Sequence, residues 1–294
     1  AIAVALRATL TNNNVQLENI RAVEQVTTTD DGVTCDVDRG DGTDKFNADL
    51  LIAADGGESS LRDLLGIGER VRDYAQVALS AIVKAAKPVA MTAFERFTPD
   101  GPLALLPMRD DCYGLVWCMA PDQASKLVGG TSSQIEGALE VRSGAALGKL
   151  ELQSPPVCFP LKAIRANSNI ADRCVLLGDA AHQLHPVAGQ GLNLGLRDVA
   201  DLAERLSVAL RDGIDIGDAA HLGAYARARR ADQRRVFRAT DSLVRIFSSS
   251  ILPLGFARQS AMLAMQMSPA LKKRFALAAM GLEPPVSAMV GGAL

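Results

Sequence analysis

Two short apolar runs, far apart in the chain, each end in a turn made of glycine and aspartate. Leu50–Ala54 stops at Asp55, and Arg173–Leu177 stops at Gly178 and Asp179. An unbroken apolar run of this length is typical of a strand that is buried on both faces of a parallel sheet. Ligands of open α/β sheets sit beyond the carboxyl ends of such strands, so both turns are candidate binding loops.

The segment before Leu50 has the β-branched residues and turn signals of short strands. Strands are predicted at Val15–Ile20, Arg21–Thr29 and Val33–Val37. After the first apolar run, Ser60 is predicted to begin a short helix, with Asp63 as its partner in a capping box. From about residue 69 to 164, short strands alternate with turns, which predicts an antiparallel sheet domain. One helix, at about residues 132–150, is expected inside it.

The chain returns to α/β texture after residue 165, so the antiparallel sheet is predicted to be an insertion. A helix follows the second glycine-rich loop, and its apolar residues recur at spacings of four and three, which predicts one face on the core. These residues are Leu192, Leu196, Val199, Ala203, Leu206 and Leu210. The remainder, to about residue 282, is predicted to be helical, with breaks at Pro253, Pro269 and Gly281.

Composition narrows the function classes. The chain has 294 residues and a net charge of -2, which gives no basic footprint for nucleic acid. It has five cysteines, an odd number without a C-x-x-C pair, which favours reduced thiols in the cytoplasm. His182 and His185 lack a third nearby ligand, so support of the surrounding loop is favoured over a metal site.

The richest segment for chemistry is residues 177–195, where a buried strand leads into a glycine-rich loop and a helix. Asp179 offers an acceptor for sugar-like hydroxyls, and Gly189 and Gly191 let the backbone approach a ligand closely. Free N–H groups at the helix start favour negative charge, as carried by a reduced flavin. The amides of Gly191, Leu192 and Asn193 are then the expected donors. The alternative is that these glycines serve only as turns and caps.

Residues 177–195 resemble the second flavin motif of the p-hydroxybenzoate-hydroxylase-like monooxygenases. Residues 55–62 are similar to that superfamily's Asp-Gly…Ser…Arg motif, which lies near the FAD pyrophosphate and the path of NAD(P)H. Residues 93–108, 114–118 and 159–161 narrow the resemblance to the ubiquinone-biosynthesis hydroxylases, in particular the 2-octaprenyl-6-methoxyphenol hydroxylase-like group. The resemblance implies cofactor contacts at Asp55, Gly56, Arg62, Gly178, Asp179, Pro186, Gly189, Gln190, Gly191, Leu192 and Asn193.

The same resemblance implies the fold and its division. The expected fold class is α/β, with an FAD-binding parallel sheet, an inserted antiparallel β substrate domain and a helical C-terminal region. Residues 1–68 and 166–235 are then the two parts of the FAD-binding domain. Residues 69–165 form the substrate domain, and residues 236–294 form the C-terminal region.

The implied activity is hydroxylation of the aromatic ring of a prenylated phenol in ubiquinone biosynthesis. NAD(P)H reduces FAD, and O2 then gives a flavin C4a-hydroperoxide, so the cofactor carries the chemistry and no catalytic acid–base pair is expected. Phe94, Phe97, Pro107 and Trp117 are the expected substrate contacts, with ordinary sheet packing as an equal alternative. For Arg62, a nicotinamide phosphate contact and a solvated helix position are both open.

One family feature has no counterpart here. The family begins with a strand and G-x-G-x-x-G, where a helix start receives the pyrophosphate, and the sequence contains no such motif. The expectation is an N-terminally truncated chain that lacks at least one βαβ unit of roughly 30 residues. Such a chain is expected to bind FAD poorly and to be inactive alone.

Partners and location follow from the same features. The chain is expected in the cytoplasm, with a peripheral position at the inner membrane as the other option, and a homo-oligomer is compatible with the sequence. An arginine cluster at residues 227–238 suits either anionic lipid or a solvated helix face. The apolar tail at residues 236–267 suits a membrane, other quinone-biosynthesis proteins or docking on its own flavin domain. The functional alternatives are a non-catalytic scaffold subunit and, more weakly, a flavin reductase or halogenase.

Overall fold

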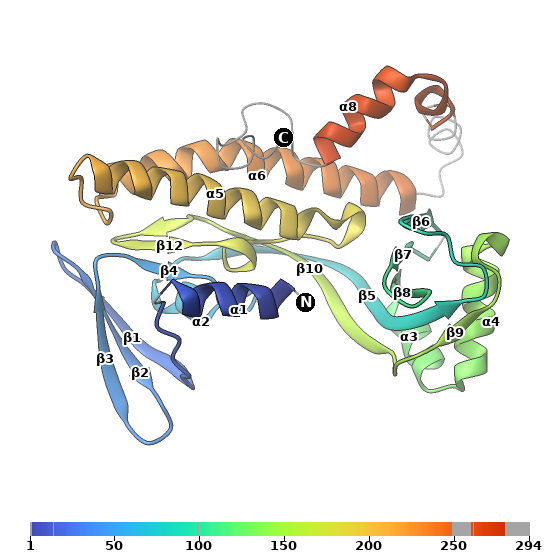
Figure 1. The fold of residues 1–294 in the computed structure, drawn as a ribbon, viewed down its shortest axis with the longest axis horizontal. Coiled ribbons are helices and arrows are strands. Elements are labelled where there is room, and N and C mark those ends of the chain that lie inside the picture. The colour runs from blue at the N-terminus through green and yellow to red at the C-terminus, as the bar shows by residue number, and fades with distance from the viewer. Residues whose placement is uncertain (1, 14, 99, 249–259, 261, 280–294) are drawn as a thin grey trace.

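The computed structural model describes residues 2–13, 15–98, 100–248, 260 and 262–279. Within them, the strands form three sheets, and the long helices α5 (Gln190–Arg211) and α6 (Ala219–Ser248) lie side by side over them (Figure 1). The expected helix breaks at Pro253 and Gly281 fall outside the described residues. In the described part, no helix is both long enough and apolar enough to cross a membrane.

An antiparallel sheet follows the N-terminal helix α1 (Ile2–Asn12). It consists of β1 (Ala22–Thr28), β2 (Val33–Asp38) and β3 (Thr43–Ala48), so two of the predicted strands are confirmed. The strand predicted at Val15–Ile20 is wrong, because this segment has no regular structure. Its apolar side chains remain exposed, and among the described residues no neighbouring strand pairs with it.

The two apolar runs form strands of one sheet that run parallel, as predicted, and the structure shows that they are direct neighbours. β4 (Leu51–Ala53) pairs with β12 (Cys174–Leu176), and β11 (Ile170–Ala171) pairs antiparallel with β12 on its other side. All three residues of β12 are fully buried, as expected for a central strand. Burial on both faces is wrong for β4, since Ile52 is 42% exposed at the edge of this sheet.

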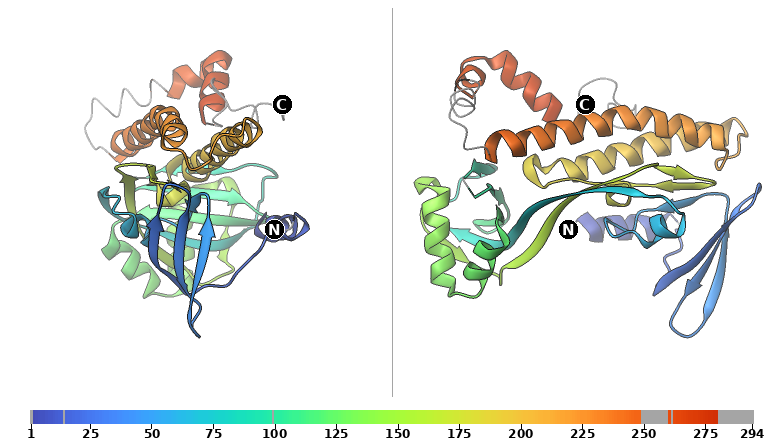
Figure 2. Two further views of the ribbon diagram at one scale, coloured as in Figure 1. Left: turned by 90° about the vertical axis from the view of Figure 1, so that its left-hand side faces the viewer. Right: turned by 180° about the vertical axis from the view of Figure 1, so that it is seen from behind.

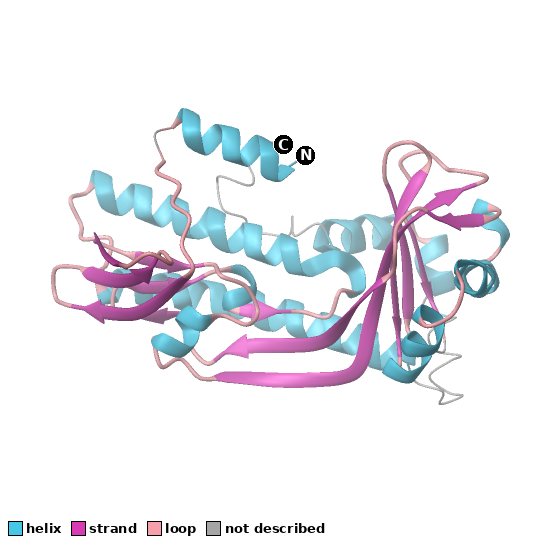
Figure 3. Ribbon diagram, turned by 90° about the horizontal axis from the view of Figure 1, so that it is seen from below, coloured by secondary structure: helices cyan, strands magenta, loops and turns pink. Residues whose placement is uncertain are grey.

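The largest sheet contains the antiparallel domain predicted between residues 69 and 164. Its two longest strands, β5 (Glu69–Ala85) and β10 (Val157–Ala166), run side by side from the parallel sheet into this domain (Figure 3). The order of the paired strands is β13 (His182–Gln183), β10, β5, β8 (Cys112–Met119), β7 (Pro102–Pro107) and β6 (Phe94–Phe97), with β9 (Leu150–Leu152) beside β5. Because β13 belongs to the loop after β12, this sheet reaches back to the candidate binding loop.

Two helices, not one, cover the far face of this sheet. α3 (Pro121–Val128) begins with a proline at its first helical position, and α4 (Ser132–Ser143) ends before Gly144, whose φ is 78°. A short 3-10 turn, Ala145–Leu147, follows. The single helix predicted at about residues 132–150 is therefore wrong in extent, because Gly144, with a positive φ that favours glycine, ends α4 early. Leu79, Leu115 and Leu139 are fully buried between the sheet and these helices.

The helices beyond the sheets are continuous over long stretches. α6 runs without interruption through the predicted boundary between residues 235 and 236. Pro269 begins α8 (Pro269–Ala279), as the sequence predicts. Figure 2 shows α5 and α6 side by side on the same side of the sheets, with α8 beyond them.

Most of the residues predicted for the core face of α5 do not pack on the core, although Leu206 does. Leu192, Leu196, Val199 and Leu210 are 69%, 56%, 48% and 66% exposed, whereas a second row, containing Leu194, Leu202 and Ala209, is buried. Both rows have helical spacing, so the pattern alone could not select between them. The neighbours decide: Leu194 packs against Leu184 and Val236, and Leu202 packs against Val175 and Tyr225.

This assignment predicts different costs for two leucines on one helix. Leu194→Ala is expected to lower the free energy of unfolding by about 3 kcal/mol, because it leaves a cavity in the core. Leu196→Ala removes the same atoms from an exposed position and is expected to cost less than about 1 kcal/mol. Urea unfolding of both variants measures the difference, and equal losses would contradict the orientation of α5.

Candidate functional site

The two glycine–aspartate loops leave the same edge of the parallel sheet. In the β4–β12 pair, Ala53 lies opposite Leu176, and the Leu177 amide donates to the Ala53 carbonyl at 2.9 Å. Asp55 then begins the first loop, and the 3-10 turn η2 (Gly178–Ala180) begins the second. Parallel pairing thus brings together two loops that are more than a hundred residues apart in the sequence.

The Asp55 carboxylate organises the first loop. It accepts a hydrogen bond from the Ser59 hydroxyl at 2.5 Å and another from the Leu61 amide at 3.1 Å. Ser59, not Ser60, is the N-cap of α2 (Ser60–Leu64), since its hydroxyl accepts from the Arg62 amide at 3.0 Å. The predicted helix start at Ser60 is confirmed, but the predicted capping box with Asp63 is wrong, because the N-cap is one residue earlier. Gly56 has a φ of 97° beside open space, which leaves its backbone accessible to a ligand.

Arg62 connects the two loops through its buried side chain. Its guanidinium donates to the Gly57 carbonyl at 2.9 Å and to the Ala180 carbonyl at 3.0 Å, and it forms an ion pair with Glu69. The side chain is 3% exposed, so the solvated position considered for it is wrong. Its role in cofactor binding stays a prediction, and the observed contacts make it a structural link between the loops.

The second loop presents Asp179 to solvent. Gly178 adopts a φ of 57°, and Asp179 is exposed, with no hydrogen bond to its carboxylate from any described residue. A Cβ on Gly195 would lie 3.4 Å from the Gly178 Cα, so this loop is in close contact with the first turns of α5. The carboxylate therefore stands free beside a helix N-terminus.

The N-terminus of α5 favours the binding of a negatively charged group. Gly189 is its N-cap with a φ of 58°, no side chain caps the helix, and its first turn contains no acidic residue. A Cβ at Gly189 or Gly191 would meet nothing within 4 Å, which leaves an open cradle over the backbone. The amides of Gly191, Leu192 and Asn193 and the helix dipole favour an anionic group there. These features fit the anionic pyrimidine edge of a reduced flavin.

His185 anchors the loop that leads into α5. It is 1% exposed, its Nδ1 accepts from the Val187 amide at 3.2 Å, and its Nε2 lies 3.4 Å from the Gln76 amide oxygen. Its ring also packs edge-on against Tyr74, with ring centroids 4.9 Å apart. The next residue, Pro186, is exposed and precedes the 3-10 turn η3 (Val187–Gly189). Through Gln76, the loop is fixed to β5.

The buried imidazole of His185 predicts acid sensitivity. Burial lowers the pKa of His185 from 6.5 to about 4, so the folded chain keeps it neutral where the unfolded chain protonates it. The free energy of unfolding is then full above pH 6.5 and falls by up to about 3 kcal/mol as the pH drops toward 4. Urea unfolding across this range checks it. His185→Gln should remove this part of the pH dependence, and an unchanged slope in that variant would contradict the assignment.

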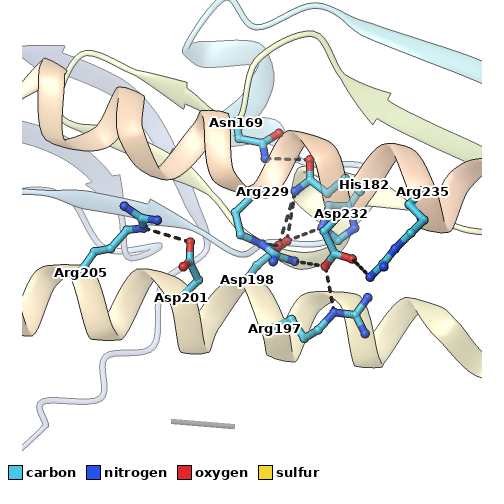
Figure 4. Close-up of polar contacts among 10 residues, drawn as sticks. Asn169, His182, Arg197, Asp198, Asp201, Arg205, Arg229, Asp232 and Arg235 are labelled. Carbon is cyan, nitrogen blue, oxygen red and sulfur yellow. Dashed lines mark hydrogen bonds and ion pairs between the residues drawn. The ribbon is translucent and has the colours of Figure 1, made fainter. Parts of the chain in front are cut away.

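A buried ion-pair network ties the second loop to both long helices (Figure 4). His182, in β13, pairs through Nε2 with the Asp198 carboxylate on α5, and both side chains are fully buried. Arg229 on α6 donates to the other Asp198 oxygen at 2.6 Å. Burial opposes the charge on Arg229, but Asp198 and Asp232 together raise the pKa of its guanidinium. His182 stands out in the sequence because it lies in the glycine-rich loop, but the sequence does not indicate that Asp198 and Arg229 are its neighbours.

Asp232 extends this network along α6. It accepts from Arg197 at 2.9 Å and from Arg229 at 2.8 Å, and it also pairs with Arg235 (Figure 4). Burial disfavours its ionised form, yet Arg197 and Arg229 hold its pKa below the ordinary range. Asp232 therefore stays ionised, and the network joins α5 to α6 behind the loop.

The structure does not bring the four predicted substrate contacts together. Directly opposite residues of a sheet share a face, and this places Phe94 and Trp117 on the helix-covered face. Trp117 is 3% exposed in that core, next to a cavity of about 410 Å³ between the sheet and α3 and α4. Phe97 belongs to the opposite face, here called the open face because α3 and α4 do not cover it, and Pro107 is exposed at the end of β7. For Phe94 and Trp117, sheet packing is the role observed.

The open face of the large sheet is the better candidate for a substrate surface. It carries Phe159, which is 55% exposed, whereas Ala78 and Cys118 in the same row are buried. Gln76, the partner of His185, belongs to the same row of β5. The open face thus continues to the loop that leads into α5. Phe159 was noted in the sequence only as part of a family match, because its exposure depends on strand register.

Comparison with known proteins gives a family and relatives. The profile of a family described as an FAD binding domain matches residues 2–240. The chain is 39% identical over 260 residues to the ubiquinone hydroxylase UbiL of Rhodospirillum rubrum and 33% identical over 253 residues to the human mitochondrial ubiquinone biosynthesis monooxygenase COQ6. These alignments cover 87% and 74% of the chain. They confirm the resemblance to ubiquinone-biosynthesis hydroxylases.

Solved structures agree on the fold. The OxyS anhydrotetracycline hydroxylase of Streptomyces rimosus superimposes with a TM-score of 0.71 over 95% of this chain, at 23% sequence identity. The α/β fold class with an antiparallel insertion is thereby confirmed. The chain spans 60% of the length of UbiL, 54% of COQ6 and 55% of OxyS.

Proposed function

Because this chain belongs to the FAD-binding domain family, we propose that it forms part of a flavin-dependent monooxygenase that hydroxylates the aromatic ring of a prenylated phenol in ubiquinone biosynthesis. The observation that carries the proposal is the uncapped N-terminus of α5 beside the free Asp179 carboxylate. The names of the two relatives support the substrate class.

FAD would be held by both loops at the edge of the parallel sheet. Asp179 would accept hydrogen bonds from the ribitol hydroxyls, and the amides of Gly191, Leu192 and Asn193 would face the pyrimidine edge. Gly56 and Asp55 would form the wall on the pyrophosphate side. When bound and reduced by NAD(P)H, FAD supplies the activation of O2 that ring hydroxylation needs.

The residues of the chain bind and orient the flavin and the phenol, and they exclude water from the site. The N-terminus of α5 stabilises negative charge without a counter-charged side chain, so its preference does not change with pH in the neutral range. His185 stays neutral there and fixes the loop through Gln76 and Val187. The open sheet face, with Phe159 and Phe97, gives the phenol ring an apolar surface beside this loop.

The finer assignments are part of the same proposal. Residues 1–68 and 166–235 act as the flavin part, residues 69–165 as the substrate part and residues 236–294 as a helical region. The protein works in the cytoplasm or at the inner membrane surface, where a prenylated phenol is accessible. Association with other quinone-biosynthesis proteins or with a second copy is compatible with the exposed face of α5.

The Asp179 carboxylate is expected to be essential for tight flavin binding. Asp179→Ala should weaken FAD binding by roughly 10- to 100-fold, because it removes hydrogen bonds to an ionised acceptor. Titration of the purified protein with FAD, followed by flavin fluorescence, measures the change. Asp172→Ala removes an exposed carboxylate at the opposite end of β12. It is the matched control and should bind FAD like the parent.

A cellular test separates an enzyme from a scaffold. In a strain that lacks its own ring hydroxylase, the full-length gene should restore ubiquinone, and the same gene with Asp179→Ala should instead accumulate an under-hydroxylated prenylphenol. Mass spectrometry of lipid extracts gives the readout. If Asp179→Ala restores ubiquinone as well as Asp172→Ala does, a non-catalytic scaffold subunit is the better explanation.

A further inference from the structure

A polar cavity lies between the large sheet and α6, away from the candidate flavin loop and from the cavity next to Trp117. Its volume is about 340 Å³. Its walls come from the start of β5, the end of β10, the turn that follows and the middle of α6. Five arginines contribute to the lining: Arg70, Arg165, Arg227, Arg230 and Arg234.

These arginines are arranged so that they repel one another. Arg70 and Arg165 lie directly opposite each other on β5 and β10. Arg227, Arg230 and Arg234 recur at spacings of three and four, which places them in one row along α6. Like charges opposite each other on a sheet or in one helix row are destabilising unless something between them compensates.

No acidic side chain supplies that compensation in the described part of the chain. None of the five arginines forms an ion pair with a described carboxylate, whereas Arg229 and Arg235 of the same helix pair with Asp198 and Asp232. Burial and the charges of Arg70, Arg234 and Arg230 lower the pKa of Arg165. The cavity therefore gathers five arginines without carboxylate partners, and the described carboxylates of α6 are engaged elsewhere, Asp232 with Arg197 and Arg229 and Asp241 with Arg72.

Neutral hydrogen-bonding groups complete the cavity wall. Asn167, Ser168 and Asn169 form the turn after β10 and line the same space. The Asn169 amide donates to the Gln233 side chain at 3.0 Å, which fixes this wall to α6. Guanidinium groups together with amides and a hydroxyl are the donors that proteins use to surround phosphate oxygens.

We propose that this cavity is a binding site for a phosphate-bearing anion, distinct from the flavin loop. The anion lies between the sheet pair Arg70 and Arg165 and the helix row of Arg227, Arg230 and Arg234. It offsets the repulsion among these side chains. The same chemistry belongs to a soluble phosphate compound and to the headgroup of an anionic lipid, and the site accepts the phosphate in either case.

Binding of two probes to the purified protein tests the proposal. Inorganic pyrophosphate is titrated by calorimetry, and vesicles of phosphatidylglycerol and phosphatidylcholine are tested by co-sedimentation against vesicles of phosphatidylcholine alone. At least one probe should bind, with an affinity that falls as salt is added. The double variant Arg165→Gln/Arg230→Gln should weaken that binding by at least about tenfold. Pyrophosphate binding alone indicates a soluble ligand, and vesicle binding alone indicates a lipid headgroup.

A matched double variant separates a built site from general positive charge. Arg109→Gln/Arg211→Gln removes two exposed arginines that lie outside the cavity, and its binding should stay within about twofold of the parent. Because the cavity arginines repel each other, the Arg165/Arg230 variant should unfold at a Tm no lower than that of the parent, so misfolding cannot explain its loss. Absence of binding by both probes, or an equal loss in the control variant, would overturn the proposal.

Discussion

Asp198→Ala is expected to lower the free energy of unfolding by about 4 kcal/mol, because it leaves the buried Arg229 guanidinium without its closest counter-ion. The Asp198 carboxylate is fully buried, and it accepts from Arg229 at 2.6 Å while pairing with His182. Removal of one partner of a buried ion pair exposes the other to the full cost of desolvation. Urea unfolding measures the loss.

The same helix provides a control for this prediction. Asp201 pairs with Arg205 one turn apart on α5, and both side chains are partly exposed (Figure 4). Asp201→Ala removes an identical carboxylate, yet it should cost less than about 0.5 kcal/mol, as measured for exposed helical pairs. Similar losses in the two variants would show that the buried network adds nothing beyond surface electrostatics.

A double-mutant cycle isolates the pair itself. Arg229→Met leaves Asp198 buried without its guanidinium partner and should also be costly, whereas Asp198→Ala/Arg229→Met removes both charges. The double variant is therefore expected to cost less than the sum of the single changes, with a coupling energy of about 1–3 kcal/mol. A coupling near zero would mean that the two residues contribute independently.

The loop motifs were predictable because each is contiguous in the sequence. Leu50–Ala54 and Arg173–Leu177 end in turns whose glycines and aspartates fix both the strand ends and the loop conformations. Parallel pairing then follows from the apolar character of the two runs, and the structure places Ala53 opposite Leu176. Local chemistry therefore determines where the loops begin.

The orientation of α5 was not predictable, because two rows on the helix have helical spacing. The buried row contains Asp198 between Leu194 and Leu202, so it reads as less apolar than the exposed row. A charged residue inside an otherwise apolar row is a usable signal for a buried ion pair. Its partners, His182 and Arg229, come from other elements, and sequence spacing carries no information about them.

Which aromatic residues reach the substrate surface depends on strand register, and the sequence specifies that register only weakly. Aromatic residues at Phe94, Phe97 and Trp117 alternate between two faces of one sheet, and a shift of one residue would exchange those faces. The structure assigns Trp117 to the helix-covered core and leaves Phe159 on the open face. Aromatic character alone therefore did not separate packing from binding.

Arg62 is the residue whose loss should disturb both flavin loops at once. Arg62→Met is expected to lower the free energy of unfolding by about 4 kcal/mol, because the carbonyls of Gly57 and Ala180 lose their donor in a buried environment. The ion pair with Glu69 is lost as well. Arg62→Lys should recover only part of this loss, since an ammonium cannot reproduce the fixed fork of a guanidinium.

The consequence for the site distinguishes a link from a surface charge. In Arg62→Met, the loops at Gly57 and Ala180 are no longer held together, so FAD affinity should fall along with stability. Arg72→Met breaks an exposed pair between β5 and Asp241 on α6 and should change stability by less than about 1 kcal/mol and FAD affinity hardly at all. Urea unfolding and FAD titration of both variants give the two readouts. If Arg62→Met lost stability but bound FAD with the parental affinity, the loops would be held in place by the sheet edge alone.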